Sequence, residues 1–264
     1  MLNVYKKIGE TPLECLNRLR EHYPEYKDVP LSYAGRLDPM AEGVLLVLVG
    51  EDNKKREKYL SLNKEYTANI LFGFTTDTYD ILGLNHLPQA GDRPDILFDQ
   101  NVLGKRLCEV LKKFTGKFLQ TYPPYSSKTV DGRPLFEWAR SDELNKIQIP
   151  SREVEINSIT LENYKMIDKA ELHKLIKKKI ALVKGDFRQK EILQCWEKAL
   201  GQSKTKNFPV AQIKIKCSSG TYVRSLAHSL GETLGTGALA LSIIRTRIGQ
   251  YDIKDSICLE KTKA

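Results

Sequence analysis

The sequence predicts a mixed α/β fold with a substantial sheet, because helical and strand patterns alternate along the chain. Residues 43–49 are almost wholly apolar, which is typical of a buried central strand. In residues 211–217, apolar side chains alternate with Gln212, Lys214 and Lys216, as expected of a strand with one buried face. Neither internal repeats nor low-complexity segments interrupt this alternation.

The elements of the N-terminal half follow from local signals. Thr11 and Pro12 predict the start of a helix, with the threonine as its cap and the proline in its first turn. The apolar stripe of this helix is expected at Leu13, Leu16, Leu19 and Tyr23. Residues 53–60 predict a short basic helix. Residues 66–72 alternate larger apolar with polar or smaller side chains, which predicts a half-buried strand.

Two further helices are predicted from apolar residues at helical spacing. The first covers residues 103–114, and the second covers residues 223–234 and ends at Gly235. Together with the strands, they place most of the chain in regular structure.

Composition and charge narrow the class of protein. The formal net charge of +9 indicates a polyanionic partner, because phosphates attract clustered Lys and Arg. No apolar run approaches the roughly 20 residues that a membrane span needs, and the first 18 residues lack the layout of a signal peptide. The five cysteines and four histidines are scattered, which favours reduced thiols in a cytoplasm and argues against a metal site.

The segment 35–46 carries the clearest chemical signal. Asp38 lies between two glycines, Gly35 and Gly43, and is followed by Pro39, which excludes it from the right-handed helical region. A carboxylate held on such a turn, just before a buried strand, is a candidate catalytic group. The alternative is an ordinary turn, because Asp-Pro is a common turn dipeptide.

Several motifs that follow one another along the chain decide between a catalytic carboxylate and an ordinary turn. The pattern Gly-x-Leu-Asp-Pro-x-Ala-x-Gly-Val-Leu resembles the active-site motif of the TruB family, the tRNA pseudouridine synthases that modify the T-arm. The resemblance covers most of residues 3–165 and 208–253. Its other motifs are Lys64-Glu65-Tyr66, Thr76-Asp77-Thr78-Tyr79-Asp80, Pro124-Tyr125-Ser126-Ser127-Lys128 and Cys217-Ser218-Ser219-Gly220-Thr221-Tyr222-Val223-Arg224.

The resemblance implies the pseudouridine synthase fold, a large, mixed, mainly antiparallel sheet with surrounding helices and a central catalytic cleft. We expect one catalytic domain, residues 1–264, with an RNA-gripping insertion at about 115–150. The chain ends soon after Tyr251, which leaves no room for the C-terminal PUA domain that often follows. Residues 168–206 have no counterpart in the family and predict two helices, strongly basic around Lys177-Lys178-Lys179. They either add a grip on RNA or, as we prefer, form a hairpin with a solvated charged face.

The resemblance also assigns catalytic roles. Asp38 is the essential carboxylate, which either attacks the anomeric carbon or removes a proton from the neighbouring ribose carbon. Arg224 matches the arginine that pairs with it, and a nearby guanidinium stabilises an ionised carboxylate. Tyr66 matches the tyrosine that stacks on the target base, which loses its stacking partners when it is extruded. Tyr222 matches a second tyrosine of the active site.

The same comparison predicts residues that contact RNA. Basic side chains of the insertion would meet phosphates and an aromatic one could stack on a base. Asp80 is also a candidate contact, although a turn former needs no function, and Ile243 matches a leucine that lines the pocket. Two positions depart from the family: a tyrosine replaces the usual histidine five residues before the aspartate, and an arginine replaces a small hydroxyl residue. The predicted contacts are Tyr33, Arg36, Asp80, Tyr125, Lys128, Arg133, Arg140 and Ile243.

The function implied is isomerisation of uridine to pseudouridine, at position 55 in the tRNA T-arm, without cofactor or metal. The departures at Tyr33 and Arg36 leave ribosomal or another structured RNA as an alternative substrate. A catalytically silent RNA-binding protein of the same fold is a second alternative. A glycoside hydrolase is disfavoured, because such enzymes need two carboxylates flanking the bond. We expect a cytoplasmic monomer without membrane contact.

Overall fold

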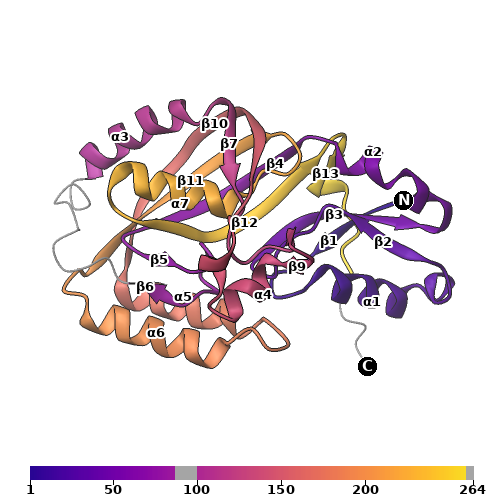
Figure 1. The fold of residues 1–264 in the computed structure, drawn as a ribbon, viewed down its shortest axis with the longest axis horizontal. Helices are drawn as coiled ribbons and strands as arrows, with labels where there is room; N and C mark the ends of the chain where they lie inside the picture. Colours follow the sequence, from indigo (N-terminus) through magenta and orange to yellow (C-terminus); the bar gives the residue numbers. More distant parts are fainter. Residues whose placement is uncertain (87–99, 260–264) are drawn as a thin grey trace.

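A computed structural model describes residues 1–86 and 100–259. Its centre is a nine-stranded sheet in the order β1-β3-β12-β4-β11-β10-β7, with β2 paired to β3 and β13 to β12 (Figure 1). Its strands are β1 (Leu2–Lys6), β2 (Leu31–Ala34), β3 (Ala41–Val49), β4 (Lys64–Phe72), β7 (Gly116–Thr121), β10 (Ser151–Asp168), β11 (Asn207–Cys217), β12 (Ala238–Ile248) and β13 (Tyr251–Asp252). Every pairing in it is antiparallel except that of β12 with β3, as the sequence predicts for a mainly antiparallel sheet.

Helices and two small hairpins surround this sheet. The helices are α1 (Pro12–His22), α2 (Arg56–Leu60), α3 (Gln100–Lys113), α4 (Leu135–Arg140), α5 (Lys169–Ile180), α6 (Gln189–Gln202) and α7 (Val223–Leu234). Short 3-10 helices cover Pro24–Tyr26, Gly50–Lys55, Leu144–Lys146 and Ile253–Asp255, and the hairpins pair β5 (Thr75–Thr76) with β6 (Asn85–His86) and β8 (Thr129–Val130) with β9 (Arg133–Pro134). Among the described residues, no helix has the length and apolar character that crossing a membrane requires.

Opposite faces of the sheet carry different helices, because neighbouring side chains of a strand point to opposite sides. Ile70 of β4 and Ala240 of β12 belong to the core that α3 and α7 complete. Leu71 and Leu241, one position along, belong to the core that α5 and α6 complete. The helices predicted within 168–206 therefore exist, and their apolar stripes bury one face of the central sheet. Figure 1 shows these two helix pairs on opposite sides of the strands.

The first helix corrects one prediction from the sequence. Thr11 caps α1 as expected, in a reciprocal arrangement with Glu14. Leu13, however, has 60% of its surface exposed, whereas Cys15 is fully buried in the core between α1, β1 and β3. Packing against β1 and β3 decides which face of α1 is buried: positions 12, 15, 16, 18 and 19 are buried, and Leu13 lies on the solvent side. The predicted helix over 53–60 is likewise a 3-10 turn followed by α2.

The parallel contact between β3 and β12 places the segment that precedes β3. Gly43 of β3 lies opposite Arg245 of β12 and has φ +109°. A Cβ atom at Gly43 would lie 2.3 Å from the carbonyl oxygen of Arg245, so only glycine permits this approach. The Arg245 side chain is 1% exposed and donates hydrogen bonds to the carbonyl oxygens of Gly35, Arg36 and Val44. The loop that carries Asp38 is thereby tied to the central sheet.

We predict that Gly43→Ala destabilises the protein by about 3 kcal/mol or more, because the added methyl group overlaps backbone atoms that belong to a paired strand and the new residue must hold a positive φ. Urea unfolding followed by circular dichroism measures the loss. Gly104→Ala is the matched control: its Cβ meets no atom within 4 Å and lies within α3, so it should leave stability equal or higher. Equal stabilities of the two variants would contradict this account of the β3–β12 contact.

Candidate active site

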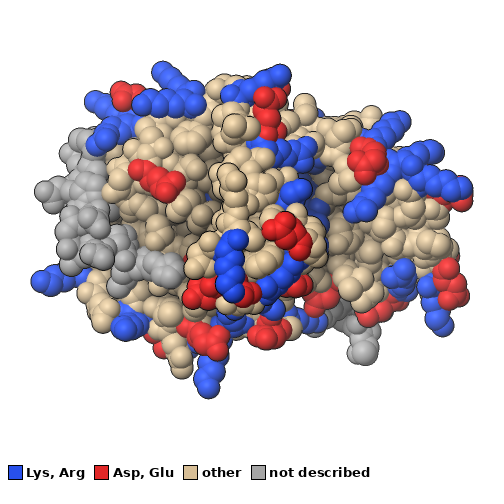
Figure 2. Space-filling view, in the orientation of Figure 1, with Lys and Arg blue, Asp and Glu red and all other residues tan. Residues whose placement is uncertain are grey.

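A cavity of about 690 Å³ lies where the loop before β3, the start of α7 and the segment after β7 meet. Its size is that of a typical small-molecule site. Seven of its lining residues are Lys or Arg and three are Asp or Glu, so its balance of formal charge is positive. Figure 2 shows blue basic side chains along a hollow between the larger part of the molecule and the part that carries α1 and α2. A cavity with this charge suits a phosphate-bearing ligand.

Asp38 is positioned at the wall of this cavity by its own loop. Its carbonyl oxygen accepts a hydrogen bond from the N–H of Ala41, the first residue of β3, and the Pro39 carbonyl accepts one from the N–H of Gly9. Its side chain is 37% exposed, so the carboxylate can reach a bound molecule. The sequence predicted a carboxylate on a constrained turn before a buried strand, and this geometry is observed.

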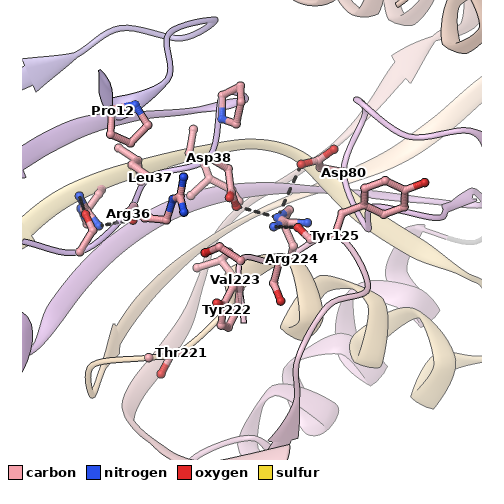
Figure 3. A pocket seen from close by; sticks show the side chains of 18 of the residues that line it. Pro12, Arg36, Leu37, Asp38, Asp80, Tyr125, Thr221, Tyr222, Val223 and Arg224 are labelled. Carbon is pink, nitrogen blue, oxygen red and sulfur yellow. Dashed lines mark hydrogen bonds and ion pairs between the residues drawn. The ribbon is translucent and has the colours of Figure 1, made fainter. Parts of the chain in front are cut away.

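The guanidinium of Arg224 lies against Asp38, although 186 positions separate the two residues. Its Nε atom donates to Asp38 Oδ2 at 2.7 Å, and Figure 3 marks this contact with a dashed line. Its other nitrogens donate to the carbonyl oxygens of Thr78, at 2.6 Å, and Tyr125, at 3.2 Å. Arg224 is only 3% exposed; burial opposes its charge, but the two nearby carboxylates, Asp38 and Asp80, raise its pKa above the usual value. It therefore presents a permanent positive charge from inside the protein.

Asp80 is the second carboxylate at this arginine, 3.7 Å from its Nε atom. Its Oδ1 atom accepts hydrogen bonds from the Thr78 hydroxyl and from the N–H of Leu82, and the residue is 5% exposed. Burial raises the pKa of Asp80 to about 6; Asp38 adds to this effect and Arg224 opposes it. Asp80 lines the cavity beside Arg224, so the structure brings it to the site, and its contact with RNA stays a prediction.

Two tyrosines and one aliphatic residue provide the other walls. Tyr66 of β4 is 8% exposed, and burial raises its pKa to about 12, so its hydroxyl keeps its proton at neutral pH. Tyr222 caps α7, and the Gln120 side chain fixes its backbone by bonding to both its N–H and its carbonyl oxygen. Ile243 of β12 lies between Ala41 and Ala68 in the sheet register. All three line the cavity together with Asp38, as their motifs predicted.

The predicted RNA-gripping insertion divides into two parts. Its first residues form β7, an edge strand of the main sheet paired with β10, so the segment outside the sheet is 122–150. Within it, Tyr125 and Arg140 line the cavity. Lys128 is exposed above the Tyr122 ring, outside the cavity. Arg133 is engaged within the segment itself, by an ion pair with Glu143 and by stacking over Trp138. Contacts of Lys128 and Arg133 with phosphates stay predictions.

Tyr33 and Arg36, the two positions that depart from the family, lie in different surroundings. Arg36 is exposed at the edge of the cavity, so its guanidinium is available to a ligand. Tyr33 does not line the cavity; its ring packs against the core between α1 and β3. The structure therefore brings Arg36, and not Tyr33, to the site.

Several cavity residues had not been predicted. Arg152 reaches the loop before α7, where its guanidinium lies against Gly220. Phe187 and Arg188 reach the cavity from the connection between α5 and α6. A charged residue at a buried position of a strand pattern could have drawn attention to Arg245. No sequence pattern connects residues 187 and 188 to a site whose other residues come from segments before and after them in the chain.

The raised pKa of Asp80 predicts how stability depends on pH. Between about pH 4 and pH 6 the folded state keeps a proton that the unfolded chain has lost. The free energy of unfolding of the wild type, relative to Asp80→Asn, should therefore fall across this window by on the order of 2 kcal/mol and become constant above about pH 7. Urea unfolding of both proteins at several pH values measures the difference. A difference independent of pH would contradict the buried position of this carboxyl group.

Comparisons with known proteins identify the family of this chain. The family model described as the TruB family pseudouridylate synthase, N-terminal domain, matches residues 26–179. A tRNA pseudouridine synthase B of Bacteroides fragilis is 31% identical over 262 residues, which cover 98% of this chain and 89% of the relative. A protein of the same name from Nostoc sp. is 30% identical over 261 residues, 98% of this chain and 70% of the relative.

Solved structures share the fold at lower identity. A Cbf5–Nop10–Gar1 complex contains a chain that is similar with a TM-score of 0.57 and 18% identity, over 98% of this chain and 51% of that one. An archaeal box H/ACA Nop10–Cbf5 complex gives a TM-score of 0.53 and 17% identity, over 98% and 50%. This chain thus spans about half the length of those chains, and the likeness concerns the fold. The family model and the two relatives named tRNA pseudouridine synthase B show that the chain belongs to the TruB family of pseudouridylate synthases.

Proposed function

We propose that this protein isomerises uridine to pseudouridine in the T-arm of tRNA, at position 55, with Asp38 as its essential catalytic residue. The observation that carries the proposal is one accessible carboxylate paired with a buried arginine, in a basic cavity with aromatic walls. Membership of the TruB family supplies the reaction, and the relatives named tRNA pseudouridine synthase B supply the class of substrate.

The reaction breaks the bond between ribose C1′ and N1 of uracil and forms one between C1′ and C5. The proton of C5 is lost and N1 gains one, so atoms balance without an external group. Asp38 acts at the sugar in its charged form, either as nucleophile at C1′ or as base at C2′. Arg224 supports both roles, because its guanidinium stabilises the carboxylate and fixes its direction.

The walls of the cavity would receive the extruded base. Tyr66 offers a ring on which uracil can stack, and Ile243 offers an apolar surface nearby. Because the pKa of Tyr66 is raised to about 12, its phenol is a hydrogen-bond donor and a poor base at neutral pH. Tyr222 stands against Tyr122 with a ring separation of 5.5 Å, which limits its movement. A detached base could turn in such a site without escaping.

The surrounding basic residues would hold the RNA backbone. Arg36, Arg140 and Arg152 line the cavity, and their guanidinium groups suit phosphate oxygens. The segment 122–150 would cover the RNA, with Tyr125 as its inner aromatic residue.

We further propose that one catalytic domain, 1–264, suffices for this activity. We also propose that the protein acts as a monomer in the cytoplasm. Light scattering after gel filtration measures the oligomeric state.

The alternative functions make different demands on the site. A silent RNA-binding protein would not need the buried pairing of Arg224 with Asp38 and Asp80. A glycoside hydrolase needs two carboxylates that both face the bond, whereas Asp80 is 5% exposed and hydrogen-bonded within the protein. Ribosomal RNA stays an alternative substrate, and supplying it beside the T-arm substrate decides between them.

We predict that Asp38→Asn abolishes turnover, lowering it by at least about a thousandfold, because the amide can act neither as nucleophile nor as base. Tritium release from C5-labelled uridine in a T-arm stem-loop measures turnover. Affinity for the stem-loop should stay within about threefold, since phosphate contacts dominate it. Glu57→Gln, the same chemical change at the edge of the cavity, is the matched control and should stay active. An active Asp38→Asn would refute the mechanism, and a wild type silent on tRNA and ribosomal RNA would refute the function.

A further inference from the structure

The connection between α5 and α6, residues 181–188, is a loop that is anchored by two buried helices and held by internal hydrogen bonds. The helices on either side bury Leu172, Ile176 and Trp196 completely, and the Trp196 indole donates to the carbonyl oxygen of Ile81. Within the loop, the Gln189 side chain donates to the carbonyl oxygens of Val183 and Gly185 and accepts from the N–H of Phe187. The loop is thus fixed relative to the sheet.

Arg188, at the end of this loop, joins two other segments of the chain. Its Nη1 atom donates to Asp77 Oδ2 at 2.8 Å. Its guanidinium also lies over the Tyr125 ring, 4.6 Å from the ring centre, which is a cation–π contact. Its backbone has φ +60°, a conformation that non-glycine residues adopt only where the surroundings enforce it. A second contact joins this loop to the segment 122–150: the Arg140 guanidinium donates a hydrogen bond to the carbonyl oxygen of Asp186.

Tyr125 connects this contact with the catalytic pair. Its ring is held by Arg188, whereas its carbonyl oxygen accepts a hydrogen bond from Arg224, at 3.2 Å. The segment 122–150 lies outside the main sheet, and Gln120, Tyr122 and Tyr125 attach its near end to the site. Its far part, including α4, meets the loop between α5 and α6 through Arg140. Without that loop, this part would have fewer contacts with the body of the protein.

We propose that the α5–α6 hairpin is a support for the RNA-binding segment 122–150, and that Arg188 is its positioning residue. By holding Tyr125 and α4 at the edge of the cavity before RNA arrives, the support lowers the conformational entropy lost on binding. Arg188 acts through Asp77 and Tyr125 and makes no contact with phosphate. The proposal rests on the proposed function for its catalytic consequence, but not for the support itself.

Hydrogen–deuterium exchange of the protein without RNA tests the support directly. Arg188→Ala should increase exchange in peptides that cover 122–146, whose amides include those of Leu135 and Phe136, hydrogen-bonded within the segment. Lys190→Ala removes the same charge from an exposed position of the same hairpin and should leave exchange unchanged. Exchange equal to wild type in Arg188→Ala would overturn the proposal. This measurement needs no turnover, so it stays decisive even if the proposed function fails.

Kinetics on the T-arm stem-loop test the consequence. Arg188→Ala should raise KM about tenfold with kcat within about twofold, the effect of losing a cation–π contact and a partly buried ion pair. The affinity of Arg188→Ala for the stem-loop should depend on salt concentration as that of the wild type does. If Arg188 contacted a phosphate, its loss would reduce the slope of log affinity against log salt concentration by about one. A reduced slope would make Arg188 an RNA ligand and overturn the supporting role. Arg188→Lys, which keeps the charge but loses the planar stacking, should restore KM only in part.

A double-mutant cycle tests the route through Asp77. Asp77→Asn removes the charge that Arg188 pairs with, while its side-chain oxygen can still accept from the N–H of Leu84. If the two residues act through one contact, the double variant should raise KM little more than Arg188→Ala alone. Additive effects would show that Arg188 does not act through Asp77.

Discussion

The buried guanidinium of Arg224 is the interaction on which the rest of the site depends. A charge removed from water is retained only when partners replace the lost solvation. Here the partners come from three segments: Asp38 before β3, Thr78 and Asp80 after β5, and Tyr125 after β7. Each segment is therefore held in place by the need to satisfy one arginine, and the same bonds direct the carboxylate of Asp38 into the cavity.

The two carboxylates at this arginine differ in environment, and the difference assigns their roles. The side chain of Asp38 is 37% exposed and that of Asp80 is 7% exposed, so Asp38 is the more accessible carboxylate of the cavity. Burial raises the pKa of Asp80 to about 6, and its Oδ1 atom is engaged by hydrogen bonds within the protein. Asp38 is thus the more accessible of two carboxylates beside a permanent cation. This arrangement suits an isomerisation at a glycosidic bond, in which the base leaves and returns within a closed site.

Most of the fold and the centre of the site could be predicted from the sequence, because both depend on local patterns. The strand around Ile70 and the end of α7 at Gly235 follow from periodicity and a glycine cap. The prediction for Leu13 was wrong, because packing against β1 and β3, and not apolar spacing alone, decides which face of α1 is buried. Arg188 could not be predicted: its contacts with Asp77 and Tyr125 arise only when the hairpin has packed on the sheet, and no local pattern encodes them.

The hairpin of α5 and α6 shows how a core element can also serve a site. Its inner face buries Leu172 and Trp196 against the sheet, so both ends of its loop are anchored to the core that carries the catalytic residues. A support must itself be rigid, because a mobile one would not restrict the conformations of the segment that it holds. Tyr125 is where the two systems meet, its carbonyl bonded to Arg224 and its ring covered by Arg188. Tyr125 thus links the proposed support of the RNA-binding segment to the arginine that pairs with Asp38.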